Sequence, residues 1–165
     1  MPTSATPSTR TTPQQSETCP VARSLDVVGD RWSLLIVRDA FDGVRRFSDF
    51  QRGLGMARNI LADRLHKLVE AGVLELQAAS DGSAYQEYVL TAAGERLFPV
   101  VVALRQWGER HRFGAGERHS TLVDRRTGKP VPPMQPLAKD GTAIRPADTE
   151  VRKLKQDIGP DRTGV

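Results

Sequence analysis

Between residues 20 and 42, apolar residues recur at the three- and four-residue spacing of helices. Pro20 can occupy the first turn of a helix that ends at Gly29, and the apolar face of this helix is Val21, Leu25 and Val28. Asp30 can cap a second helix that ends at the Asp42-Gly43 turn, and its shared face is Trp32, Leu35, Ile36 and Ala40. Two helices are therefore predicted before residue 44.

The next segment has the pattern of a helix-turn-helix. Ser48 can cap a short helix, and Gly53 and Gly55 break the chain before a longer helix from Arg58 to Ala71. The predicted buried stripe of the longer helix is Ile60, Leu61, Leu65, Leu68 and Val69. Its other faces carry Arg58, Asn59, Asp63, Arg64, His66 and Lys67.

A β-hairpin is predicted directly after this helix. Gly72 ends the helix, and Val73–Ala78 can pair with Tyr85–Leu90 across the Asp81-Gly82 turn. Helix, turn, helix and hairpin follow one another in the order of a winged helix-turn-helix. The predicted fold class is therefore mainly α with a small β-hairpin wing (α+β).

A further helix is predicted after the hairpin. Thr91 can cap it, Pro99 divides it, and its second part runs to about His111. One side of this helix carries Leu97, Phe98, Val101, Leu104 and Trp107. A domain this small cannot bury all of these side chains, so we expect part of this side to form a homodimer interface.

Beyond Gly114 the helical pattern is lost. Residues 124–132 and 139–146 each resemble a turn that leads into a short strand, which predicts a C-terminal β-hairpin-rich appendage. The predicted organisation is a disordered N-terminal tail (1–18), a domain with its dimerisation helix (19–113), the appendage with short strands (114–149), and a charged, disordered tail (150–165).

Composition narrows the class of protein. The chain has 165 residues and a formal net charge of +4, a mildly basic balance that favours an acidic partner such as nucleic acid. Cys19 is its only cysteine, which excludes an intramolecular disulfide and indicates a reducing, cytoplasmic location. No apolar run is long enough to span a membrane, and the first 18 residues lack the apolar segment of a secretory signal.

An ordered set of motifs resembles one known family. The motifs are Cys19-Pro20-Val21, Leu25 to Trp32, Arg46-Phe47-Ser48-Asp49, Asn59 to Leu65, Glu70-Ala71-Gly72, Glu87 to Thr91 with Gly94, Leu97-Phe98-Pro99, and Trp107-Gly108. Together they are similar to HxlR-type regulators, which are related to the MarR group. The resemblance implies a bacterial winged-helix homodimer that binds a palindromic double-stranded DNA operator, with one recognition helix per half-site.

The resemblance also draws attention to Cys19 and to two departures. In some members of the family the matching cysteine senses oxidants or electrophiles; the alternative is a small buried hydrophobe. Ala57 stands where the recognition helix often begins with a capping serine. The wing from Glu75 to Tyr88 contains no lysine or arginine, so it offers no cationic side chain to a phosphate.

Positive charge gathers around the predicted helix-turn-helix. From Gly43 to Lys67 there are six cations and two anions. We expect base readout by Arg58, which suits guanine, and Asn59, which suits adenine. The expected phosphate contacts are Arg45, Arg46, Ser48, Arg64 and Lys67. In the alternative reading these arginines are a solvated face, with Arg64 paired to Asp63 or Glu70 and Arg46 bracing the wing.

The sequence contains no motif of a metal site or of a catalytic site. The three histidines lack zinc-ligand spacing, and there is no glycine-rich phosphate loop or nucleophile elbow, so neither a metal, a cofactor nor an enzyme is expected. Trp32 and Trp107 favour packing, although an aromatic pocket for a small-molecule effector is left open. The leading function is a sequence-specific transcriptional regulator. The alternative is a thiol- or ligand-responsive sensor whose C-terminal region makes the main contact.

Overall fold

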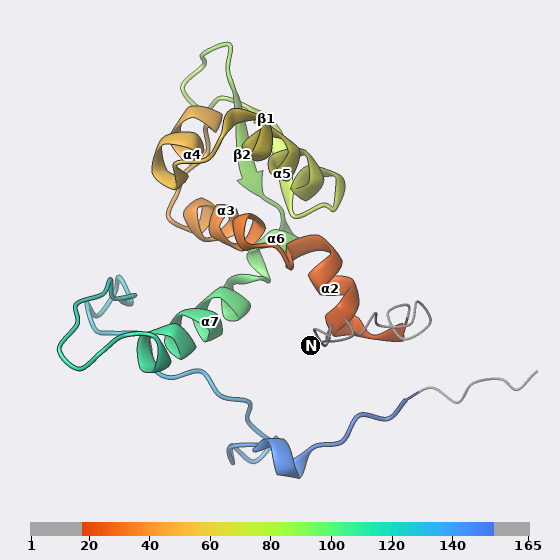
Figure 1. Ribbon diagram of the computed structural model, residues 1–165, viewed down its shortest axis with the longest axis vertical. Helices are drawn as coiled ribbons and strands as arrows, with labels where there is room; N and C mark the ends of the chain where they lie inside the picture. The colour runs from red at the N-terminus through yellow and green to blue at the C-terminus, as the bar shows by residue number, and fades with distance from the viewer. Residues whose placement is uncertain (1–17, 154–165) are drawn as a thin grey trace, which may run out of the picture. The chain divides into compact units, whose positions relative to one another are not determined.

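The computed structural model describes residues 18–153 (Figure 1). Its elements are α2 (Pro20–Val28), α3 (Arg31–Phe41), α4 (Phe47–Leu54), α5 (Arg58–Glu70), β1 (Leu74–Ala78), β2 (Gln86–Leu90), α6 (Ala92–Glu95), α7 (Phe98–His111) and the 3-10 helix η1 (Pro146–Asp148). The chain divides into two compact units, Cys19–Met134 and a second that includes residues 135–153. The tails predicted at 1–18 and 150–165 lie largely outside the described residues.

Local signals determine where the first two helices begin and end. Pro20 lies in the first turn of α2, and the carboxylate of Asp30 accepts hydrogen bonds from the backbone N–H groups of Trp32 (2.9 Å) and Ser33 (3.0 Å). These bonds satisfy two of the amides that a helix leaves unpaired at its start. The predicted cap at Asp30 is confirmed.

The helix-turn-helix forms as predicted, with one local difference. Gly55 ends α4 with φ of 63°, the left-handed conformation that glycine adopts without a Cβ clash. The predicted cap at Ser48 is wrong, because α4 begins at Phe47 and its N-cap is Arg46, without a side-chain bond. Phe47 packs against the core, which places Ser48 within the first helical turn.

Helix α3 lies at the centre of the Cys19–Met134 unit. It packs against α2, α4, α5, α7 and β2, and the core between these elements includes the fully buried side chains Ile36, Val37, Phe50, Leu61, Leu65 and Leu68. Burying a side chain of this size stabilises the fold by about 1.5–3 kcal/mol. The core thus fixes α4 and α5 against α3.

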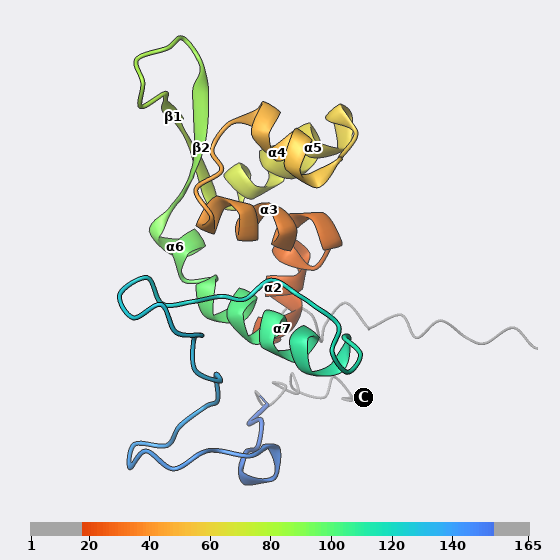
Figure 2. The ribbon, with the colours of Figure 1, turned by 90° about the vertical axis from the view of Figure 1, so that its left-hand side faces the viewer.

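The predicted wing is confirmed. Strands β1 and β2 pair in antiparallel register from Leu74 opposite Leu90 to Ala78 opposite Gln86, and the hairpin extends past the helices (Figure 2). The backbone N–H of Tyr88 also donates to the carbonyl of Arg45 at 2.8 Å. The chain entering α4 is therefore hydrogen-bonded to the wing.

Beyond α7 the chain runs back along that helix (Figure 2), held by hydrogen bonds from Arg105 to the carbonyl (2.9 Å) and hydroxyl (3.0 Å) of Ser120. The predicted β-hairpin-rich appendage is wrong. Within the described residues after α7 there are two isolated bridges, Val123 with Pro130 and Leu137 with Ala143, and no strand. Prolines at positions 130, 132, 133 and 136 lack the N–H that a ladder needs.

Candidate nucleic-acid interface

Helix α5 has one buried and one outward face. Leu61, Leu65 and Leu68 are fully buried at helical spacing, so the residues on the opposite side face solvent. The predicted buried stripe is wrong at Ile60, which is 40% exposed because it lies a helical step away from the leucines. The outward face of α5 is therefore wider than the sequence indicated.

The start of α5 presents the two predicted base-reading residues. Arg58 and Asn59 are the first two residues of the helix, and both are exposed. The Arg58 guanidinium lies 5.0 Å from the centre of the Phe47 ring of α4, a cation–π contact that orients it. Ala57 provides no capping oxygen, as predicted, so the first amides of α5 have no side-chain acceptor there.

Arg45 and Arg46 connect the chain before α4 to acidic residues of the wing. Arg46 forms an ion pair with Asp81 at the wing turn, and its Nε lies 3.8 Å from the buried carboxylate of Glu87. Arg45 lies 3.6 Å from the same carboxylate. Hydrogen bonds from Ser83, and then the contact with Arg46, lower the pKa of Asp81 to about 2. Arg46 thus braces the wing, which is the alternative that the sequence left open for it.

The remaining predicted phosphate contacts differ in whether an acidic side chain already pairs with them. Ser48 is exposed in the first turn of α4. Arg64 is 28% exposed and lies 3.4 Å from Asp30, and Lys67 lies 3.0 Å from Asp63. Arg64 therefore joins α5 to the start of α3. Arg64 also lies 3.5 Å from Asp63, a partner that the sequence indicated as an alternative, whereas the sequence did not indicate Asp30.

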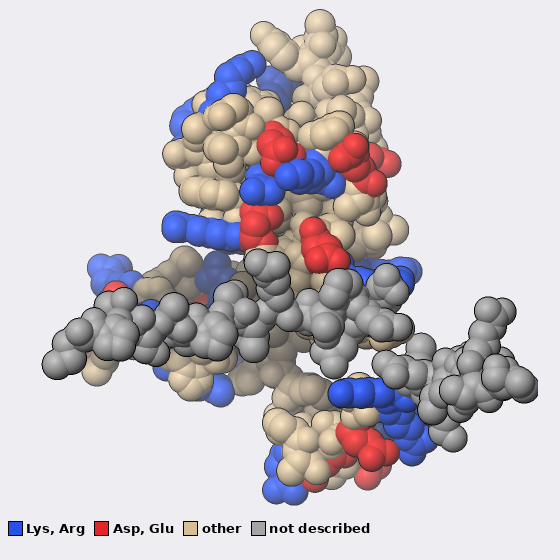
Figure 3. Space-filling model, turned by 45° about the vertical axis from the view of Figure 1, so that its right-hand side comes forward, with Lys and Arg blue, Asp and Glu red and all other residues tan. Residues whose placement is uncertain are grey.

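On the face seen in Figure 3, the charged side chains do not form one continuous basic surface. Acidic and basic side chains lie next to one another across the middle of the Cys19–Met134 unit on this face, and basic side chains lie at its upper edge (Figure 3). This distribution agrees with the ion pairs of Arg64 and Lys67.

Cys19 lies at the start of the domain. It is the N-cap residue of α2 and is partly exposed, and its carbonyl accepts a hydrogen bond from the backbone N–H of Arg23 at 3.1 Å. The sensor thiol and the small buried hydrophobe both stay predictions for Cys19.

The predicted dimer-interface residues divide into two sets. Leu97 and Val101 pack against the core of their own unit, and Phe98 contacts Phe41 edge to face, with ring centres 5.1 Å apart. Leu104 and Trp107 face outward and are 51% and 56% exposed. Val100, which was not among the predicted residues, joins them on the outward side of α7 at 48% exposure.

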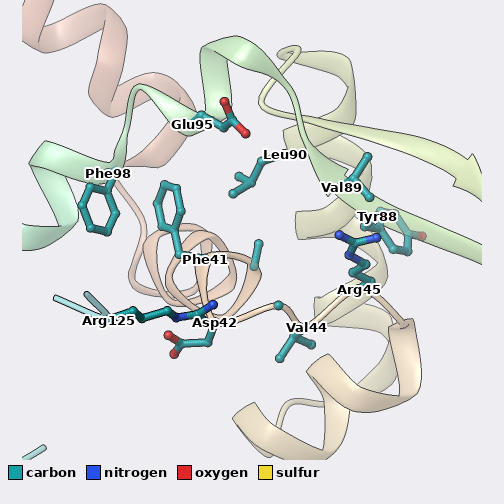
Figure 4. A pocket seen from close by; sticks show the side chains of 12 residues that line it. Phe41, Asp42, Val44, Arg45, Tyr88, Val89, Leu90, Glu95, Phe98 and Arg125 are labelled. Atoms are coloured by element: carbon teal, nitrogen blue, oxygen red, sulfur yellow. The ribbon is translucent and has the colours of Figure 1, made fainter. Parts of the chain in front are cut away.

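A cavity of about 550 Å³ lies between the end of α3, strand β2 and the start of α7 (Figure 4). Phe41 and Phe98 form an aromatic wall, and Glu95 and Arg45 lie at other edges. Arg125, from the segment beyond α7, extends toward Asp42 at the opposite edge. The cavity combines an aromatic wall with charged edges.

The described residues hold neither a metal-binding cluster nor a membrane-spanning helix. Between residues 18 and 153 no group of three or more His, Cys, Asp or Glu side chains could hold a metal ion. Over the same residues no helix has the length and apolar character that crossing a membrane requires.

The fold and the exposed start of α5 define the class as helix-turn-helix proteins that bind DNA. Residues 27–114 match the HxlR-like helix-turn-helix model, and the chain belongs to that family. It is 47% identical over 91 residues to the uncharacterized HTH-type transcriptional regulator Rv3095 of Mycobacterium tuberculosis, a match that spans 55% of this chain and 58% of Rv3095. Because this is a family of transcriptional regulators, the prediction that the chain is not an enzyme is confirmed.

Solved structures agree with this assignment. PA1607, whose crystal structure is known, is 53% identical in sequence to this chain, and the two structures superpose with a TM-score of 0.80. The match spans 86% of this chain and 99% of PA1607, so the likeness continues beyond residue 114. The redox regulator HypR in its oxidized form is 31% identical, with a TM-score of 0.53, over 58% of this chain and 100% of HypR. A MarR-family protein from Porphyromonas gingivalis is 26% identical, with a TM-score of 0.50, over 58% of this chain and 94% of that protein.

Proposed function

We propose that this chain acts as a homodimeric, sequence-specific regulator that binds a palindromic operator, with α5 of each subunit in the major groove. The exposed pair Arg58 and Asn59 at the start of α5 carries this proposal. In helix-turn-helix proteins the first residues of the second helix reach the base edges. Arg58 offers two donors to guanine, and Asn59 offers a donor and an acceptor to adenine.

Contacts to the DNA backbone would come from residues around this helix. We assign them to Arg45, Arg46, Ser48, Arg64 and Lys67. Ser48 lies in the first turn of α4, where backbone amides favour an anion. The other four are cations whose ion pairs with carboxylates would loosen as phosphates approach. The exposed guanidinium of Arg45 needs the least rearrangement.

Dimerisation through α7 accounts for its outward apolar stripe. Leu104 and Trp107 are half exposed, and large apolar side chains in a row on a small domain are typical of a subunit interface.

Placing aspartate at Leu104 would bring an unpaired charge into that interface, so Leu104→Asp is expected to halve the mass measured by light scattering. Arg110→Asp, on the same helix, is the control and should leave the mass unchanged.

Regulation is proposed to act through Cys19, through an effector, or through both. Cys19 is partly exposed, and the relative HypR is described as a redox regulator. The cavity beside Phe41 and Phe98 could hold a small aromatic effector. Under the thiol reading, diamide weakens operator binding by the wild type and leaves a Cys19→Ser variant unaffected.

The central test is fluorescence anisotropy with the DNA upstream of the protein's own gene, compared with scrambled DNA. The wild type is expected to prefer the native DNA by about 10³-fold or more. Arg58→Ala and Asn59→Ala should each remove about 1–3 kcal/mol of this discrimination. Arg96→Ala, which removes one exposed cation outside the helix-turn-helix, is the matched control.

A double Arg58→Ala and Asn59→Ala variant that still prefers the native DNA would contradict the assignment. It would favour the second function, in which the region after residue 114 makes the main contact.

A further inference from the structure

The wing has no positive charge of its own. Between Glu75 and Tyr88 there is no lysine or arginine, and there are three acids, Glu75, Asp81 and Glu87. A hairpin with this charge repels the DNA backbone, because each phosphate is negative. Any cation that lies on the wing therefore has to come from another segment of the chain.

Two arginines from the chain before α4 provide such cations. Arg46 forms an ion pair with Asp81 through Nη2, and its Nε lies 3.8 Å from the carboxylate of Glu87. The guanidinium of Arg46 also lies 5.7 Å from the centre of the Tyr85 ring. Arg45 reaches the same carboxylate of Glu87, with Nη1 at 3.6 Å. Both guanidinium groups thus lie against side chains of the wing.

The two carboxylates that hold these arginines are themselves fixed by the wing. The side chain of Glu87 is 7% exposed, and the hydroxyl of Ser80 donates a hydrogen bond to it at 3.3 Å. A buried carboxylate is stable where cations and donors surround it. Asp81 is exposed in the turn, and it accepts a hydrogen bond from the backbone N–H of Ser83 at 3.0 Å. Each carboxylate therefore gives its arginine a defined place.

Both arginines keep donors for a further acceptor. An arginine side chain carries five N–H donors in a rigid fork. Arg46 uses Nη2 for Asp81 and turns Nε toward Glu87, and no acceptor among the described residues pairs with its Nη1. Arg45 turns Nη1 toward Glu87, and within the same part of the chain its Nε and Nη2 have no acceptor. Each arginine can therefore bind a phosphate while a carboxylate holds its orientation.

We infer that Asp81 and Glu87 are specificity-determining residues for DNA binding that act through Arg45 and Arg46. The inference rests on the proposed function, in which α5 sets the register on the operator and both arginines meet its phosphates. Held in one orientation, the guanidinium groups fit phosphates at fixed positions relative to α5. On other DNA this register is absent, and the carboxylates compete with the phosphates for the arginines. They therefore lower the affinity for non-operator DNA, which depends almost entirely on charge.

The test uses two substitutions that remove a charge and keep the shape of the side chain. Asp81→Asn and Glu87→Gln release the arginines, so the affinity for scrambled DNA, measured by fluorescence anisotropy, is expected to rise about two- to fivefold, the equivalent of an exposed ion pair. The affinity for the native upstream DNA should change by less than about twofold, because lost orientation offsets the added charge. Both variants should therefore prefer the native DNA less than the wild type does.

Glu75→Gln is the matched control, because it removes one negative charge from the same wing. Glu75 is exposed and accepts a hydrogen bond from Gln77, not from an arginine. This variant should change the affinities for both DNAs by the same factor. The inference is overturned if Asp81→Asn and Glu87→Gln do the same, or if they bind both DNAs more weakly, as a purely structural role predicts. A wild type without any preference overturns the proposed function itself.

Arginine backgrounds provide a second measurement, which identifies the side chain through which an acid acts. Among the described residues, Asp81 pairs with Arg46 and not with Arg45. The effect of Asp81→Asn on the affinity for scrambled DNA should therefore disappear in an Arg46→Ala protein and persist in an Arg45→Ala protein. Asp81 is an exposed turn residue, and unfolding in urea checks that each variant folds. An effect of Asp81→Asn that survives Arg46→Ala overturns the inference.

Discussion

Asp30 has two roles at the start of α3. Its carboxylate accepts two backbone hydrogen bonds and one from the Ser33 hydroxyl, and it lies 3.4 Å from Arg64 of α5. Partial burial acts to raise the pKa of Asp30, but the bonds from Ser33 and the charge of Arg64 outweigh it and lower the pKa. One side chain thus joins α3, the central helix, to α5.

Removing this carboxylate should destabilise the domain. Asp30→Ala loses the cap, so the free energy of unfolding in urea is expected to fall by about 1–2 kcal/mol. Asp30→Asn keeps an acceptor oxygen for the amides and should lose less. Equal losses for the two variants would show that the charge facing Arg64 matters and the cap does not.

The low pKa of Asp81 predicts a pH dependence. Its pKa of about 2 in the folded protein lies below the ordinary value of 3.8, so its stabilising contribution is complete above about pH 4. The contribution is lost as the pH falls through 2. The difference in melting temperature between wild type and Asp81→Asn should therefore be constant from pH 7 to about pH 4. A difference that already fades near pH 6 would contradict this assignment.

Two of the three predicted helix caps, at Asp30 and Thr91, could be predicted from neighbours in sequence; the third, at Ser48, was wrong, and contacts that depend on the fold could not be predicted. The caps at Asp30 and Thr91 follow from a side chain two or three positions before the amide it satisfies. The partner of Arg46 is 35 positions away at Asp81. Pairs of this kind appear only after the wing has folded beside α4. Arg58 and Asn59 were predictable as exposed because the leucine spacing of α5 fixes its outward face.

At the scale of elements, the turn between α4 and α5 determines the angle between these two helices. Gly55 has φ of 63°, whereas Gly53 lies within α4, where an added Cβ would be 3.7 Å from the nearest atom, Oδ2 of Asp39. The two glycines therefore differ in whether they tolerate a side chain.

Two matched substitutions test this difference. Gly55→Ala should lower the free energy of unfolding by about 1–2 kcal/mol, because an L-residue is strained in the left-handed region. Gly53→Ala should raise it by about 0.5–1 kcal/mol, because alanine favours the helix interior. Urea titrations of the two variants check both signs, and a loss of equal size at both positions would contradict the prediction.

Element prediction succeeded where one local signal was sufficient. The Asp81-Gly82 turn between two apolar runs predicted the hairpin, and the predicted ends of both strands lie within one residue of the observed ends. The strands expected after residue 114 failed because the prolines between residues 130 and 136 leave too few donors for a ladder. The turns expected after residue 114 are flanked by single β-bridges and not by strands.

At the scale of the molecule, the segment after α7 is attached through side chains of that helix. Gln106 binds the backbone on both sides of Pro133, and Arg105 binds Ser120. No periodicity predicts such contacts, because the extended segment has no regular structure of its own. Helix α7 therefore has one side toward the core, one toward this segment and one exposed.

Loss of the Gln106 contacts should release the segment. In Gln106→Ala the backbone N–H of Met134 is expected to exchange with solvent about fivefold faster, since a hydrogen bond contributes about 1 kcal/mol. Gln106→Glu keeps the acceptor for Met134 but cannot donate to Pro132. The exchange rate of the Met134 amide in this variant should therefore lie between the rates in the wild type and in Gln106→Ala. Unchanged exchange in Gln106→Ala would mean that the apolar contacts alone hold the segment.

The carboxylates beside Arg46, Arg64 and Lys67 affect how strongly DNA binding should depend on ionic strength. Each phosphate that a free cation neutralises releases counterions, and the logarithm of the binding constant then falls with the logarithm of salt by about 0.9 per contact. A cation that already neutralises a carboxylate releases fewer ions when it changes partner. Operator binding by this protein should therefore weaken less steeply with added salt than its number of arginines and lysines suggests, and a larger share of its affinity would come from uncharged contacts.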